Sequence, residues 1–167
     1  VAPPLAAEMA GEQLTREDVL AAARAAVAGA SQAEWDSAPR TLVIEGAGGL
    51  LSPLAGELTV SDLAAALGLP LLIAARPGLG TINHTLLTLQ SARAAGLSVH
   101  AVVLTPWPEQ PSRLESYNRE TIARLGVVDV EVLGRAASAE IDELARVGGA
   151  LPWRRWVGGR VAVAAAI

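Results

Sequence analysis

The sequence contains neither cysteine nor lysine. The absence of cysteine excludes disulfides, thiolate metal sites and cysteine nucleophiles. The absence of lysine excludes a lysine base, a Schiff-base residue and a phosphate-binding lysine within the chain. A chain without cysteine is consistent with the cytoplasm, which is the location we expect.

Long hydrophobic segments and an excess of positive charge are also missing. The longest apolar run, 69–75, has the length of a strand, whereas a membrane span needs roughly 18 residues. The first residues show no basic region followed by an apolar one, so no signal peptide is predicted. Thirteen scattered arginines against seventeen acidic residues argue against a nucleic-acid partner. Because residue 1 is Val and not Met, we expect the chain to be part of a longer translation product.

What the chain does contain is ample material for one core. It has 167 residues, of which 51% are hydrophobic, and this length fits a single domain over residues 1–167. Short, continuously apolar runs alternate with helical segments. This pattern predicts an α/β fold, with a doubly wound, mostly parallel sheet and helices on both faces.

Turn and capping residues divide the chain into elements. Thr15, Ser61 with Asp62, and Ser138 are expected to start helices, and glycines are expected to end them at positions 29, 68 and 96. The tail from residue 151 is ambiguous. Strands are predicted at 41–45, 70–75, 97–104 and 127–133, and helices at 16–28, 61–67, from about 81 to 95, 112–125 and 138–147.

Ligands of open parallel sheets bind beyond the carboxyl ends of the strands, which selects the loops after Glu45, Ala75 and Leu104. In the first loop, Glu45 ends a strand and the residues at 46–49 are mostly glycine. A strand-end carboxylate is costly to bury without a partner such as Mg²⁺, and glycines let backbone N–H groups approach an anion. A tight turn with a solvated Glu45 explains the same spacing equally well.

The second loop, 76–84, leads into a helix. Gly80 and Thr81 lie where free N–H groups could bind a carboxylate or phosphate, and Asn83 could add an amide donor. The residues alone favour a plainer interpretation, in which Thr81 is an ordinary N-cap and His84 is structural.

The third loop, 105–111, is rich in proline and contains one aromatic residue, Trp107. Such a rigid segment could form the wall of a nucleobase pocket. A plain surface turn is the commoner explanation.

Four segments with the same order and spacing resemble dethiobiotin synthetase. The Gly-Leu-Gly-Thr-Ile-Asn-His run at 78–84 is much more specific than Glu-Gly-Ala-Gly-Gly at 45–49, which also occurs in related amidoligases. The resemblance covers nearly the whole chain and weakens after about Leu133. The segments are 43–54, 62–64, 68–73 and 78–89, with further likeness at 4–7, 107–108 and 118–122.

The resemblance implies a P-loop NTPase-like fold and an ATP-dependent cyclo-ligase. Such an enzyme uses ATP or another nucleoside triphosphate and Mg²⁺ to carboxylate diaminopelargonic acid with CO₂ or bicarbonate, and then closes a ureido ring. It works as a homodimer with the site at the subunit interface.

By the same resemblance, Glu45 binds Mg²⁺ and the backbone after it binds phosphate. The loop before the helix at 81–95 binds the substrate carboxylate, and two further stretches flank the nucleobase. The nucleotide-binding residues implied are Glu45, Gly46, Ala47, Gly48, Thr105, Pro106 and Ala137, with Ala136 beside it. The substrate-binding residues implied are Gly49, Leu79, Gly80, Thr81 and Asn83.

The chain also departs from the family pattern. It has no P-loop motif, which requires a lysine, so we expect the strand–P-loop–helix unit and the catalytic residues to lie outside it. Many relatives have Asn-Asp where this chain has Thr105 and Pro106, so the nucleobase stays open. Another amidoligase or deviant-Walker ATPase, or a non-catalytic remnant, are the alternatives. The 167-residue chain alone is expected to be inactive.

Overall fold

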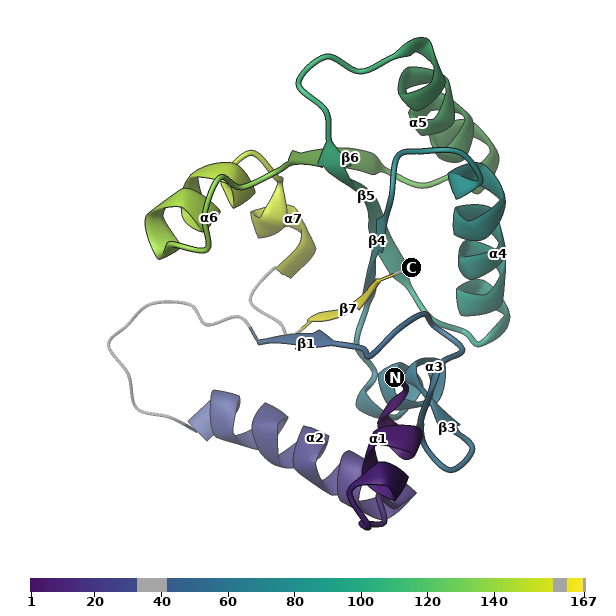
Figure 1. Cartoon of the computed structure of the whole chain (residues 1–167), viewed down its shortest axis with the longest axis vertical. Coiled ribbons are helices and arrows are strands. Elements are labelled where there is room, and N and C mark those ends of the chain that lie inside the picture. Colours follow the sequence, from purple (N-terminus) through teal and green to yellow (C-terminus); the bar gives the residue numbers. More distant parts are fainter. Residues whose placement is uncertain (33–41, 158–161, 167) are drawn as a thin grey trace.

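Five parallel strands form the central sheet of the computed structural model, which describes residues 1–32, 42–157 and 162–166. The sheet order is β1-β7-β4-β5-β6, and every neighbouring pair is parallel (Figure 1). The predicted doubly wound α/β fold is therefore confirmed. The strands are β1 (Val43–Glu45), β7 (Ala162–Ala166), β4 (Leu71–Ala75), β5 (Val99–Trp107) and β6 (Val130–Gly134).

Helices cover both faces of this sheet, and a small antiparallel hairpin lies beside it. Figure 1 shows α4 and α5 side by side on one face and α6 and α7 on the other. The helices are α1 (Pro3–Met9), α2 (Arg16–Gln32), α3 (Val60–Leu67), α4 (Thr81–Ala94), α5 (Arg113–Gly126), α6 (Ile141–Gly148) and α7 (Trp153–Val157). The hairpin consists of β2 (Pro53–Ala55) and β3 (Leu58–Thr59).

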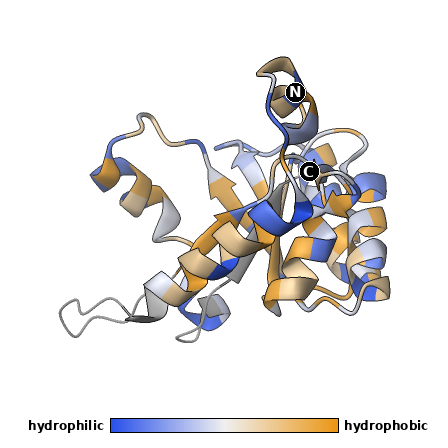
Figure 2. Ribbon diagram, turned by 90° about the horizontal axis from the view of Figure 1, so that it is seen from below, coloured by the Kyte–Doolittle hydropathy of each residue, from blue (hydrophilic) through white to orange (hydrophobic). Residues whose placement is uncertain are grey.

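The alternating side chains of strand β5 define the two core layers. Val102 and Leu104 are buried in the cluster with the α4 and α5 side chains, whereas Ala101 and Val103 pack with Trp156 of α7. Figure 2 shows the central strands mostly hydrophobic and the outer helices of mixed character. Of the described helices, none is long and apolar enough to span a bilayer.

Capping boxes mark the starts of α3 and α5. Ser112 caps α5 with Glu115 as its reciprocal partner, as predicted for a helix from 112. For α3 the predicted cap was wrong by two residues. Thr59 is the N-cap, Asp62 completes the capping box, and Gly68 ends the helix at φ 63° as expected.

Other predicted boundaries needed correction. α2 continues through Gly29 to Gln32, because an interior glycine costs a helix only about 1 kcal/mol. α6 has Glu140 and not Ser138 as its N-cap. β6 begins at Val130, because Val127 adopts a left-handed conformation (φ 46°) at the end of α5. The ambiguous tail contains α7 and β7, and the first two residues predicted in the 41–45 strand precede β1, with Thr41 outside the described residues.

Candidate functional site

The carboxyl ends of the parallel strands carry the three loops selected from the sequence. Glu45, the last residue of β1, is exposed, and β1 lies at the edge of the described sheet. Of the two interpretations of the sequence, the structure therefore shows the solvated Glu45 and not a buried carboxylate. Within the described residues Glu45 has no hydrogen bond or ion pair, so its oxygens are free to contact a cation.

The glycines after Glu45 are required by packing and by backbone conformation. A methyl group at Gly46 would lie 2.6 Å from Cγ1 of Val60, a fully buried side chain. Gly48 has φ 87°, a conformation that favours glycine. This part of the loop is a tight turn, as the simpler interpretation of the sequence held.

The start of α3 holds this turn in place. The N–H of Val60 donates to the Ser52 carbonyl at 3.2 Å, and the N–H of Ser61 donates to the Leu50 carbonyl at 2.9 Å. Leu50 itself is 2% exposed and lies in a core cluster with Leu71 of β4. The first loop is therefore fixed by burial on one side and by α3 on the other.

The second loop leaves backbone donors unused where α4 begins. Gly80 is the N-cap at φ 88° and accepts the N–H of His84 at 3.2 Å. Thr81 is not the N-cap. Its hydroxyl is buried 3.4 Å from that of Thr85. In the described part of the chain, the N–H groups at positions 79, 80, 82 and 83 donate no hydrogen bond. Free donors at a helix start attract anions.

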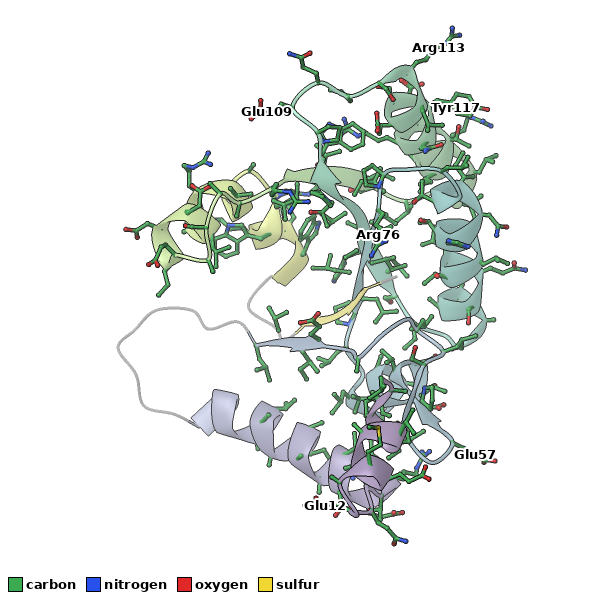
Figure 3. The ribbon with its side chains drawn as sticks, in the orientation of Figure 1. Glu12, Glu57, Arg76, Glu109, Arg113 and Tyr117 are labelled. Carbon is green, nitrogen blue, oxygen red and sulfur yellow. The ribbon has the colours of Figure 1, made fainter. Side chains whose placement is uncertain are left out.

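A cavity of about 290 Å³ lies beside this helix start. Ala75, Arg76, Leu79, Thr81 and His84 line it, and Arg76 is labelled in Figure 3. Among the described residues Arg76 has no acidic partner. A guanidinium and an imidazole therefore border the cavity at the end of α4 whose dipole favours negative charge. Asn83, predicted as an amide donor, is exposed and is not among the lining residues.

The third loop is partly strand, because β5 extends through Trp107 and pairs it with Gly134 of β6. The predicted loop from Thr105 was wrong in this respect. A cavity of about 350 Å³ nevertheless opens where β5 and β6 end. It is lined by Thr105, Pro106, Leu133, Gly134, Arg135, Ala136, Leu144, Val147 and Gly148.

The structure thus brings Thr105 and Pro106 of β5 together with Ala136, which follows the end of β6. Ala137 is not among the lining residues. Its N–H donates to Oε1 of Glu143 at 2.9 Å. Arg146 binds both oxygens of Glu143, and these hydrogen bonds lower the pKa of Glu143 to about 2. The chain entering α6 is therefore tied to that helix by an ionised carboxylate.

Comparison with known proteins decides the family. The sequence profile of the AAA domain family matches residues 1–154. The chain belongs to this family.

Individual relatives carry a more specific name. The ATP-dependent dethiobiotin synthetase BioD of Mycobacterium sp. (strain KMS) is 37% identical over 161 residues, which are 95% of this chain and 66% of that protein. The enzyme of the same name from Anaeromyxobacter sp. (strain Fw109-5) is 42% identical over 137 residues, 82% of this chain and 56% of its own. These matches confirm the resemblance seen in the sequence. The chain spans just under two thirds of the mycobacterial relative.

Sequence reasoning missed two basic residues at the cavities of this AAA-domain chain, Arg76 and Arg135, and interpreted a third, His84, as structural. Arg76 and His84 border the α4 cavity, and Arg135 borders the β5–β6 cavity. The signal for the first two was present, since they bracket the helix start eight residues apart. A larger metal centre is absent, because no group of three His, Cys, Asp or Glu residues in the described ranges could hold an ion.

Proposed function

We propose that this chain is part of an ATP-dependent dethiobiotin synthetase. The carrying observation is the start of α4, where four unused N–H groups lie in the Gly-Leu-Gly-Thr-Ile-Asn-His segment next to a cavity bordered by Arg76 and His84. The names of the relatives support the same activity. The activity is proposed for the natural polypeptide that contains this chain, which we place in the cytoplasm.

The reaction joins CO₂ to the two neighbouring amines of 7,8-diaminopelargonic acid. One amine adds to CO₂ and gives a carbamate. A carbamate oxygen then attacks the γ-phosphorus of ATP, and ADP leaves. The second amine attacks the activated carbonyl carbon, inorganic phosphate leaves, and the ureido ring of dethiobiotin closes. The chain's own residues bind and orient these partners.

The substrate carboxylate binds at the start of α4 in this proposal. Leu79, Gly80 and Asn83 supply unused backbone N–H groups and an exposed amide, Thr81 lines the cavity beside them, and Arg76 adds positive charge nearby. The carboxylate is a strong acceptor, and hydrogen bonds to an ionised group contribute about 1.5–3 kcal/mol. The diamine end of the substrate then points away from α4 and toward the nucleotide phosphates.

The nucleotide binds along the other two loops. The N–H groups of Gly46, Ala47 and Gly48 face its phosphates, Gly49 lies by the ureido region, and Thr105, Pro106, Ala136 and Ala137 flank its base. Mg²⁺ takes few protein carboxylates and leaves other positions to phosphate and water, so the exposed, unpaired Glu45 fits as one ligand. When bound, the ion neutralises charge on the phosphates. The phosphate-cradling lysine of the family has no counterpart among these 167 residues.

A homodimer completes the proposal. Leu79 is 92% exposed in the loop and Leu87 is 55% exposed on α4, which lies beside α5 on one face of the sheet (Figure 1). Apolar side chains at these positions suit coverage by a second copy of the chain. The loop at 79–83 then reaches the nucleotide site of the partner.

The test uses the natural polypeptide with Mg²⁺, ATP, radiolabelled bicarbonate and 7,8-diaminopelargonic acid. We expect label in dethiobiotin and one phosphate released for each product formed. Phosphate release without diamine, or nucleotide binding without any product, would favour another ATPase of the family. A protein that neither binds nucleotide nor releases phosphate would favour a non-catalytic chain.

A further inference from the structure

Asn118, in the middle of α5, connects that helix to the loop before α4. Its side chain is 3% exposed. Nδ2 donates to the carbonyl of Pro77 at 2.8 Å and to the carbonyl of Gly78 at 3.1 Å. These two contacts join residues 41 and 40 positions apart in the sequence. One buried amide thus holds two consecutive peptide units of the loop.

The chemistry of this contact requires an amide. Of the two ends of the Asn118 amide, only the NH₂ group can donate to both carbonyl acceptors, which settles the orientation of this side chain. A carboxylate of the same shape would place its oxygens against the carbonyl oxygens. An apolar side chain would leave both carbonyls without this donor.

Asn118 binds the two residues that directly precede the unused N–H donors in the sequence. The Gly78 carbonyl that it binds also accepts the N–H of Thr81 at 3.3 Å, which forms the turn into α4. The unused N–H groups at 79, 80, 82 and 83 follow within five residues of that carbonyl. The position of Gly78 therefore sets the direction in which these groups point.

Packing does not fix Gly78 in the way it fixes Gly46. A methyl group at Gly78 would meet no atom within 4 Å. Glycine has the largest backbone freedom, and the loop contains a second one at Gly80. Hydrogen bonds from Asn118 are therefore what restrains this part of the loop.

The helix that carries Asn118 is itself firmly held. Ser112 and Glu115 form a capping box at its start. At its end, Nη2 of Arg93 from α4 donates to the Gly126 carbonyl at 2.6 Å and to the Val127 carbonyl at 3.2 Å. α5 therefore provides a rigid frame against which the loop can be positioned.

We propose that Asn118 is a positioning residue for substrate recognition: through Pro77 and Gly78 it holds the loop so that the free N–H groups of 79–83 meet the substrate carboxylate. This inference rests on the proposed function. Asn118 does not touch the substrate, and its effect is confined to groups that bind the carboxylate end.

The test compares Asn118→Ala and Asn118→Ser with Thr121→Ala in the natural polypeptide. Thr121 is buried on the same helix and makes no hydrogen bond to the loop in the described structure, so it controls for damage to α5. We expect Asn118→Ala to raise the KM for diaminopelargonic acid about tenfold, with kcat and the Kd for ATP nearly unchanged. Asn118→Ser keeps one donor and should give an intermediate KM. The KM of Asn118→Ser also tests the proposal if the alanine variant does not fold.

A second readout separates positioning from general damage. With 2,3-diaminononane, which has a methyl group in place of the carboxylate, Asn118→Ala should change kcat/KM little. An equal loss with both diamines, or the same KM increase in Thr121→Ala, would overturn the proposal.

The proposal and the proposed function fail in different ways. If the wild-type protein forms no dethiobiotin, the proposed function is wrong, and hydrogen exchange still tests the loop. The amide of Thr81, which donates to the Gly78 carbonyl, should then exchange faster in Asn118→Ala than in Thr121→Ala. Equal exchange in the two variants would contradict the positioning role.

Discussion

The glycine loop after β1 and the glycine loop before α4 are held in place by different forces. Gly46 has no room for a side chain because it packs against buried Val60, and the turn is tied to the start of α3. Gly78 has open space around it and is held by the amide of Asn118. Similar glycine content therefore hides two kinds of constraint, one steric and one through hydrogen bonds. The first loop should be sensitive to volume and the second to donors.

The largest expected effect is on turnover. It comes from removing the charge of Glu45, the proposed Mg²⁺ ligand of the first loop, and not from changing how that loop packs. Because Glu45 is exposed and unpaired in the described structure, Glu45→Gln should leave the melting temperature nearly unchanged. Turnover should fall by about two orders of magnitude or more if the carboxylate binds Mg²⁺. The matched control is Glu57→Gln, an exposed glutamate at the β2–β3 turn (Figure 3). Near-normal Mg²⁺-dependent turnover in Glu45→Gln would remove this residue from the metal site.

Alanine at one glycine of each loop tests the steric difference. Gly46→Ala forces Val60 to move, and overpacking of this kind costs about 1–3 kcal/mol. Gly78→Ala meets no neighbour within 4 Å and should change the free energy of unfolding by less than about 0.5 kcal/mol. Urea denaturation measures both. Equal destabilisation of the two variants would show that the loops are not held differently.

The smallest expected effect is on the pH dependence of stability, and it distinguishes the contacts that hold the two loops. Hydrogen bonds from the Thr59 backbone and side chain hold the pKa of Asp62 below its ordinary 3.8. This capping box begins α3, whose first residues bind the first loop. Thr59→Ala should lower the free energy of unfolding by about 1 kcal/mol at pH 7. A lowered folded pKa gives stability that is present above pH 3.8 and is lost as pH falls through the folded value. The difference between wild type and Thr59→Ala should therefore shrink below pH 3.8.

The amide of Asn118 does not titrate, so the difference between wild type and Asn118→Ala should persist over the same range. Thermal melts from pH 7 to about pH 2.5 separate the two behaviours. A pH-independent effect of Thr59→Ala would mean that the ionised Asp62 does not contribute to the cap.

The alternation of the main strands and helices from α2 to α6 could be predicted because its signals are local, whereas α1, the β2–β3 hairpin, α7 and β7 were not predicted. Continuous apolar runs indicated the buried parallel strands, and Ser112 and Gly68 marked a helix start and a helix end correctly. The errors arose where tertiary structure decides. β5 extends to Trp107 because it pairs with β6, and the left-handed Val127 delays β6. The role of β7 between β1 and β4 depends on a pairing partner far away in the sequence.

The site could be placed from the sequence but not described in detail. The rule that ligands bind beyond strand ends selected three loops, and the structure places them at the carboxyl ends of described strands, since the rule depends only on strand direction. Whether Glu45 is buried depends on its place at the sheet edge, which the residues do not reveal. Asn118 is visible in the sequence, but its contact with Pro77 and Gly78 depends on the packing of α5 beside α4.

The most direct test of the account is the preference of the wild-type protein for a substrate with a carboxylate. The measurement is kcat/KM for 7,8-diaminopelargonic acid and for 2,3-diaminononane under the same Mg²⁺ and ATP concentrations. Because 2,3-diaminononane cannot form the charge-assisted hydrogen bonds of the carboxylate, we expect kcat/KM to be at least about tenfold higher for the acid. Equal values for the two diamines would contradict the assignment of the α4 start to the substrate carboxylate.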